Sequence, residues 1–209
     1  DIRNGFQIPP IEEFEKAITE KTKAILVCNP GNPTGTQYSK ESMLALGEIA
    51  RRHDLFLLSD EVYREFCYTD EPHFSAMNIP GLEQNVILID SVSKRYNLCG
   101  ARVGCIVSHN KDVMTAAMKF AQARLCPPVL GQYASIGALD TPDEYFAAVK
   151  EEYIKRRNYM IEGLNKSEGV FTPNPMGAFY TIAEIPVDNA ENFAKWMLET
   201  FRIDNETTM

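Results

Sequence analysis

The chain has 209 residues, of which 44% are hydrophobic and 24% charged, and its formal net charge is −8. This is the composition of a soluble globular protein with a sizeable core, and the negative charge argues against a nucleic-acid surface, which needs clustered lysine and arginine. The longest apolar runs are strand-sized and far shorter than a membrane span, so we expect neither a nucleic-acid nor a membrane partner.

The cysteines and histidines are dispersed along the chain. There are five cysteines and three histidines, with no C-x-x-C pair. This spacing predicts neither a disulfide framework nor a metal site. Scattered free thiols are typical of a reducing compartment, and no secretory signal is visible, so we expect a cytoplasmic protein.

Helix-like and strand-like segments alternate in the first half of the chain. Residues 11–18 have helical spacing, and residues 39–53 predict a helix with Ser39 as its N-cap. Four short apolar runs separate and follow these helices. Continuous runs of this kind fit strands buried on both faces, as in a parallel sheet covered by helices; they cover residues 24–28, 55–59, 86–90 and 104–108.

The second half has a different pattern. Residues 111 to about 169 are nearly all helical, with breaks at 126–128 and 140–144, and one long helix is predicted from 142 to about 167. Residues 169–186 resemble short strands around a turn, and residues 189–201 predict a helix.

We therefore predict an α/β fold with a mostly parallel sheet flanked by helices, followed by the start of a smaller α+β domain. Residues 1–155 are expected to form part of a large domain. Residues 156–209 are expected to hold the end of the long helix and an incomplete small C-terminal domain. Because the chain begins without Met and stops just after a helix pattern, we interpret it as a piece of a longer protein.

Polar residues follow the first two predicted strands. In open parallel sheets, ligands bind at the carboxyl ends of the strands. The segment NPGNPTG, residues 29–35, is a rigid turn that fixes the direction of Asn32, and either Asn–Pro bond is a candidate for the cis form. Asp60 and Tyr63 follow the next strand. The plain alternatives are a structural loop for the asparagines and a helix cap for Asp60.

An amine and a guanidinium follow further along the chain. Lys94 comes just after Ser91 and Ser93, where the run 86–90 ends. A lysine amine that can lose its proton attacks a carbonyl to form a Schiff base. Arg102 lies among small residues before the run 104–108 and suits bidentate contact with phosphate. The alternatives are a Lys94 that reaches solvent or pairs with Asp60 or Asp90, and an Arg102 that is a surface residue.

Taken together, these positions describe one ligand. A carbonyl suits Lys94, a basic ring nitrogen suits Asp60, and a phosphate suits Arg102. A ring hydroxyl suits Asn32 and Tyr63. Pyridoxal phosphate carries all four groups, so the sequence predicts it as the cofactor.

The same segments resemble a known family. NPGNPTG, SDEVY, SVSK and GARVG are similar, in order and spacing, to signature segments of the fold-type I pyridoxal-phosphate enzymes, specifically the class I/II aminotransferases typified by aspartate aminotransferase. The separations are 28 residues from Asn32 to Asp60, 34 from Asp60 to Lys94 and 8 from Lys94 to Arg102. PMGAFYTI at 175–182 resembles the family's entry into the small domain, so the likeness covers nearly the whole chain.

The resemblance implies a role for each position. Lys94 would be the catalytic residue, forming a Schiff base with the cofactor and moving a proton. Asp60 would keep the pyridine nitrogen protonated. The remaining cofactor-binding positions would hold the ring oxygen (Asn32 and Tyr63) and the phosphate (Ser91, Ser93 and Arg102), with Ser93 alternatively a structural neighbour. No residue is expected to bind a metal.

The resemblance also implies what lies beyond the chain. A glycine-containing phosphate loop and a stacking aromatic would precede Asp1, and the arginine that grips the substrate α-carboxylate would follow Met209. Arg124 is better interpreted as a surface helix arginine than as a replacement. With these parts missing, we expect the chain as given to be inactive, a folded fragment with an incomplete cofactor site.

The function implied for the whole protein is amino transfer from an amino acid to a 2-oxo acid, with aspartate and 2-oxoglutarate as the first substrates to test. A carbon–sulfur lyase or a synthase of the same fold is the alternative, because such enzymes share Lys94, Asp60 and Arg102. Family members are usually homodimers, so the whole protein is expected to be one.

Overall fold

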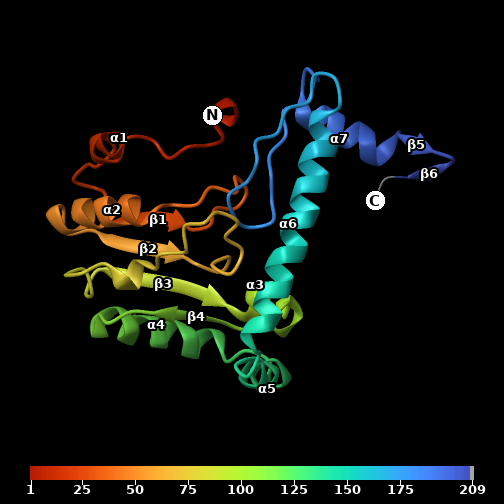
Figure 1. The fold of residues 1–209 in the computed structure, drawn as a ribbon. Coiled ribbons are helices and arrows are strands. Elements are labelled where there is room, and N and C mark those ends of the chain that lie inside the picture. Colours follow the sequence, from red (N-terminus) through yellow and green to blue (C-terminus); the bar gives the residue numbers. More distant parts are fainter. Residues whose placement is uncertain (208–209) are drawn as a thin grey trace.

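The fold is built on a four-stranded sheet. The structure is a computed structural model that describes residues 1–207 (Figure 1). The strands lie in the order β1-β2-β3-β4, with β1–β3 parallel to one another and β4 antiparallel to β3. The prediction of a mostly parallel sheet is therefore confirmed, and the bounds are β1 (Ala24–Cys28), β2 (Phe56–Asp60), β3 (Val86–Ser91) and β4 (Gly104–Val107).

The direction of β4 decides where Arg102 lies. The first three strands end at one edge of the sheet, where Cys28 is paired with Asp60. Because β4 runs the opposite way, it begins at that edge, with Gly104 opposite Ser91. Arg102 therefore lies at the amino end of an antiparallel strand, and not at a carboxyl end, yet it reaches the same edge as Asp60.

Seven α-helices accompany the sheet in the part of the chain that the structure describes. The long helix α6 runs past the edge where the parallel strands end (Figure 1). Ser39 caps α2 as predicted, its side chain accepting from the backbone N–H of Ser42. The helices are α1 (Ile11–Lys16), α2 (Lys40–Arg52), the single turn α3 (Val92–Arg95), α4 (Lys111–Arg124), α5 (Val129–Ala138), α6 (Asp143–Asn165) and α7 (Ala190–Glu199).

The segment after α6 differs from the prediction. Residues 169–186 form no strand, only isolated bridges from Phe171 to Glu184 and from Gly177 to Cys67. Prolines explain the difference, since each removes a backbone donor that a strand ladder needs. Two short strands that the sequence did not predict, β5 (Arg202–Ile203) and β6 (Glu206–Thr207), form a hairpin after α7.

The main core lies between α2 and the sheet. Val27, Leu57 and Val86 come from three adjacent strands and pack with Leu46 of α2. Gly47 permits the close approach of the chain that follows β2, because a Cβ there would lie 2.7 Å from a methyl group of Ile79. Burial on both faces, as predicted, is not found throughout the sheet.

Leu26, for example, is 69% exposed, whereas Leu57 is fully buried in the next strand. We therefore expect Leu57→Ala to lower the free energy of unfolding of this chain by about 2–5 kcal/mol, because it leaves a cavity. Leu26→Ala is the matched control and should change it by less than about 0.5 kcal/mol. Urea denaturation measures both, and equal effects of the two substitutions would contradict this account of the core.

A second cluster ties the later part of the chain to the edge of the sheet. The rings of Tyr63 and Phe66 pack edge-to-face on Phe179, and Phe66 also packs on Tyr153 of α6. The backbone N–H of Ala178 donates to the carbonyl of Phe66 at 2.9 Å. Residues 175–180 are thereby placed beside the residues that follow β2.

Candidate active site

All the residues predicted for the site line one hollow of about 440 Å³ at the edge where β1–β3 end. They come from the carboxyl ends of β1–β3 and the segments that follow them, and from the loop that precedes β4. The predicted residues are Asn32, Asp60, Tyr63, Ser91, Ser93, Lys94 and Arg102. Cys28, Val62 and Cys99 complete the lining.

Lys94 points its amine toward aromatic rings. It lies on the single turn α3, and its Nζ is 5.7 Å from the ring centres of both Tyr63 and Phe179. Within residues 1–207, no carboxylate lies at ion-pair distance from it. Asp90 instead contacts Arg64 at 3.0 Å and Arg95 at 3.8 Å. The alternative of an ion pair between Lys94 and Asp60 or Asp90 is therefore wrong.

Asp90 is occupied by these arginines, and burial raises the pKa of its carboxyl while Arg64 lowers it. Lys94 also borders a second hollow of about 640 Å³ on the side of α6, which Tyr153 and Phe179 share. Lys94 therefore lines both hollows. A carbonyl must come within reach of an amine to react with it, and a hollow beside Lys94 leaves room for such a ligand.

Asp60 keeps half of its carboxylate available. Its Oδ1 accepts from the backbone N–H of Val62 at 3.2 Å, and no helix begins there, so this is a turn contact and not the helix cap of the alternative interpretation. Among the residues that the structure describes, Oδ2 has no hydrogen-bond donor. A protonated ring nitrogen is a suitable partner for such an oxygen.

Three polar side chains form a chain beside Asp60. Asn32 Nδ2 donates to the Tyr63 phenol at 3.4 Å, and the Tyr63 O–H donates to Tyr180 at 3.0 Å. Burial, followed by the bond to Tyr180, raises the pKa of Tyr63, so its phenol remains protonated at neutral pH. The sequence prediction did not include Tyr180. Its place in the quoted segment PMGAFYTI was the available signal.

The loop that carries Asn32 is firmly built. Both Asn29–Pro30 and Asn32–Pro33 are cis. Asn29 is fully buried, and its side-chain oxygen accepts from the backbone N–H of Tyr38 at 3.0 Å. Asn29 thus has the structural role of the plain alternative, whereas Asn32 lines the hollow.

The residues predicted to hold the phosphate, Ser91, Ser93 and Arg102, also line the hollow. Ser91 caps α3, its Oγ accepting from the backbone N–H of Ser93 at 3.3 Å. Arg102 has a left-handed backbone (φ 56°), and its guanidinium donates to the carbonyl of Cys99 at 2.8 Å. A left-handed conformation is costly for a residue other than glycine, and such residues cluster at ligand sites.

The comparisons with known proteins place the chain in a family. The sequence description of the family Aminotransferase class I and II matches residues 3–203. The chain belongs to the class I and II aminotransferases. It is 37% identical over 190 residues to a putative aminotransferase, YugH, and 35% identical over 179 residues to an aspartate aminotransferase, both from Bacillus subtilis. These alignments cover 89% and 85% of the chain.

A solved structure agrees with the family assignment. The alanine aminotransferase from Pyrococcus furiosus superposes with a TM-score of 0.81 at 34% identity, over 92% of this chain and 50% of its own. The chain spans about half the length of the curated relatives, 48% of YugH and 45% of the aspartate aminotransferase.

The donor set of this aminotransferase chain fits pyridoxal phosphate. Within residues 1–207, the amine has no acidic partner and one carboxylate oxygen has no donor, and both groups line the same hollow as a buried phenol, two serines and an exposed arginine. Each matches one group of the cofactor.

Proposed function

We propose that the whole protein containing this chain is a pyridoxal-phosphate-dependent aminotransferase acting between an amino acid, aspartate first, and a 2-oxo acid. The observation that carries the proposal is Lys94, whose amine has no acidic partner among residues 1–207 and lines the same hollow as Asp60 and Arg102. Membership of the class I and II aminotransferases supports the reaction class.

The cofactor, when bound, supplies an electron sink for the electrons released at the substrate Cα. Lys94 supplies the amine that binds it and then moves a proton at Nζ. Asp60 holds the proton on the ring nitrogen through its available oxygen. Asn32 would donate to the ring oxygen with Tyr63 beside it, and three residues would hold the phosphate: Ser91, Ser93 and Arg102.

Arg102→Ala is expected to weaken pyridoxal phosphate binding by about 10- to 100-fold, because it removes a charged hydrogen bond worth about 1.5–3 kcal/mol. Arg102→Lys should recover part of the affinity, since it keeps the charge but loses the bidentate geometry. Absorbance titration of the whole protein with cofactor measures both. Arg124→Ala, a change in an exposed arginine of α4, is the control, and an equal loss in that variant would contradict the assignment.

The substrate, the domain division and the location of the protein are further parts of the proposal. Two of the three relatives described above are named for an amino acid, aspartate in one and alanine in the other, which supports amino transfer but not one amino acid. The carbon–sulfur lyase alternative finds no support among the three. The division at residue 155 falls within α6 and stays a prediction.

No helix in residues 1–207 is long and apolar enough to cross a membrane. The five thiols are unpaired, which supports a cytoplasmic location.

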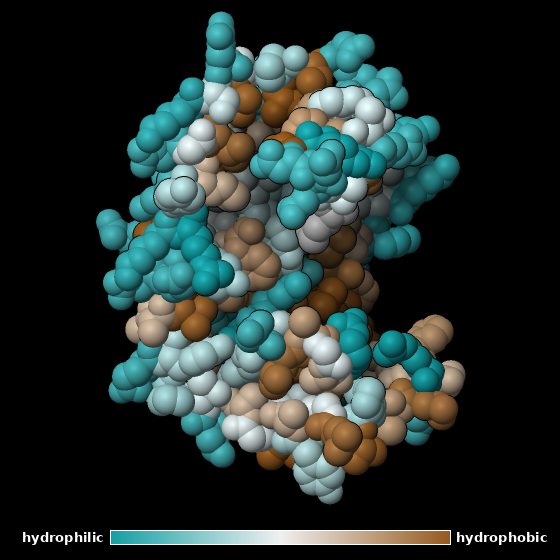
Figure 2. Space-filling model, turned by 90° about the vertical axis from the view of Figure 1, so that its right-hand side faces the viewer, coloured by the Kyte–Doolittle hydropathy of each residue, from teal (hydrophilic) through white to brown (hydrophobic). Residues whose placement is uncertain are grey.

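A homodimer is also part of the proposal. Apolar side chains gather over α5, at the bottom of the face seen in Figure 2. Val129, Leu130 and Tyr133 there are between 60% and 84% exposed. Contiguous exposed apolar groups of this kind mark protein interfaces.

The test of the function is an assay of the whole protein with a panel of amino acids and 2-oxoglutarate. Formation of glutamate and of the matching 2-oxo acid in equal amounts, fastest with aspartate, is the expected result. Release of ammonia or sulfide without glutamate would instead indicate lyase chemistry and overturn the proposal.

A further inference from the structure

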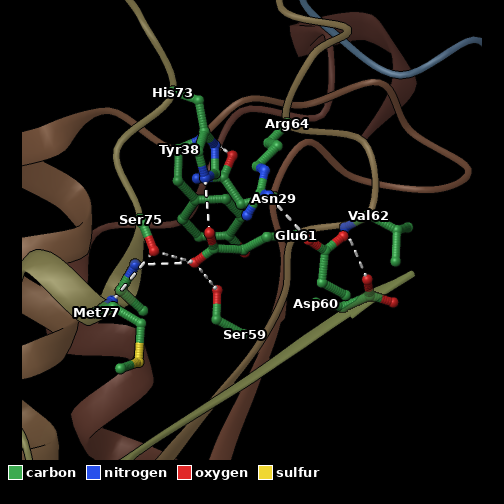
Figure 3. A network of polar contacts seen from close by, with 12 residues as sticks. Asn29, Tyr38, Ser59, Asp60, Glu61, Val62, Arg64, His73, Ser75 and Met77 are labelled. Carbon is green, nitrogen blue, oxygen red and sulfur yellow. Dashed lines mark hydrogen bonds and ion pairs between the residues drawn. The ribbon is translucent and has the colours of Figure 1, made fainter. Parts of the chain in front are cut away.

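A second carboxylate next to Asp60 has no part in the proposed chemistry. Glu61 is fully buried. Its Oε1 accepts from the hydroxyls of Ser59 at 3.0 Å and Ser75 at 3.1 Å and from the backbone N–H of Ala76 at 2.9 Å. Its Oε2 accepts from His73 Nε2 at 2.9 Å. Four donors thus converge on one carboxylate (Figure 3).

Burying the charged carboxylate of Glu61 costs free energy, because the charge is removed from water. Burial raises the pKa of the Glu61 carboxyl, but the bonds from His73, Ala76 and Ser75 outweigh burial and hold it below its ordinary value. An apolar side chain of similar size would fill the space without the cost of removing a charge from water. His73 Nδ1 is buried and has no partner among the described residues, so Glu61 is the one described hydrogen-bond partner of this ring.

Glu61 lies directly after β2, on the opposite side of the chain from Asp60. Its backbone N–H continues the ladder by donating to the carbonyl of Ile89 in β3 at 3.0 Å, and its carbonyl accepts from the N–H of Arg64 at 3.1 Å. Side chains alternate along an extended chain, so Ser59 and Glu61 lie on one side and Asp60 on the other. Figure 3 shows Asp60 and Glu61 pointing apart.

We propose that Glu61, held by His73, is a positioning residue that fixes Asp60 toward the hollow. The four donors hold Glu61 on its side of β2, and the alternation of side chains then holds Asp60 on the other. The proposal rests on the proposed function of Asp60 as the partner of the ring nitrogen.

The test is a double-mutant cycle in the whole protein, read as pyridoxal phosphate affinity by absorbance titration. Asp60→Asn and Glu61→Ala are each expected to weaken binding by about tenfold or more. Because Glu61 acts through Asp60, adding Glu61→Ala to Asp60→Asn should cost less than about a further twofold. Glu61→Gln keeps an oxygen for three of the four donors and should retain most of the affinity.

Thr172→Val is the matched control for loss of buried hydrogen bonds. Thr172 is 1% exposed and bonds Thr181 at 2.6 Å, but it does not line the hollow. The substitution should lower the melting temperature and leave the affinity unchanged. If Glu61→Ala does not fold, His73→Ala carries the same cycle with Asp60→Asn.

The outcomes separate the two proposals. Suppose that Asp60→Asn weakens cofactor binding. The positioning role is then overturned if Glu61→Ala weakens binding as much in the Asp60→Asn protein as in the unchanged protein, or if it weakens binding in neither. The proposed function stands in both cases. If Asp60→Asn itself leaves both the affinity and the absorbance spectrum of the bound cofactor unchanged, the proposed function of Asp60 fails first.

Discussion

Lys94→Ala is expected to lower the rate of amino transfer by about 10⁴-fold or more, because it removes both the attacking amine and the group that moves the proton. The structure supports an effect of this size, since Lys94 is the one lysine among the described residues that line the hollow. Steady-state kinetics of the whole protein measure the loss.

Two variants define the meaning of that result. Lys94→Arg keeps a positive charge but cannot form a Schiff base, so it should be as inactive as the alanine variant. Lys119→Ala changes an exposed lysine of α4 and should leave the rate unchanged. Activity near that of the unchanged protein in Lys94→Arg would mean that the charge of Lys94, and not its nucleophilic amine, is what the reaction needs.

Asp60→Asn is expected to lower kcat by about 10²–10³-fold, the usual cost of removing one preorganised charge that stabilises a transition state. An amide of the same shape keeps the turn contact to Val62, because its oxygen still accepts from that N–H. It cannot hold a proton on the ring nitrogen as a carboxylate does.

Two further variants and a labelling experiment test the role of the Asp60 charge. Asp60→Glu keeps the negative charge, so its kcat should lie between those of Asp60→Asn and the unchanged protein. Asp70→Asn removes an exposed carboxylate and should leave kcat unchanged. Borohydride should still attach the cofactor to Lys94 in Asp60→Asn. An unchanged kcat in Asp60→Asn would contradict the role of Asp60.

The sequence was sufficient for the local elements of the site. The apolar runs that form most of β1, β2 and β3 are visible without coordinates, and so are the polar residues that follow each of them. The order of the strand ends then brings Lys94 and Arg102 to one edge of the sheet.

Features that depend on distant contacts were not predictable in the same way. The run that became β4 has the same apolar character whichever way the strand points, so its antiparallel direction was missed. Tyr180 meets Tyr63 across 117 positions of sequence, through ring packing around Phe179. Glu61 was given no role from the sequence, because only the strand geometry separates its direction from that of Asp60.

The central claim is that Lys94 is the amine that binds the cofactor. Its most direct test is to add pyridoxal phosphate to the whole protein, reduce with borohydride and map the modified peptide by mass spectrometry. The account predicts one pyridoxyl group per chain, on Lys94. A label scattered over exposed lysines, with Lys94 unmodified, would contradict it.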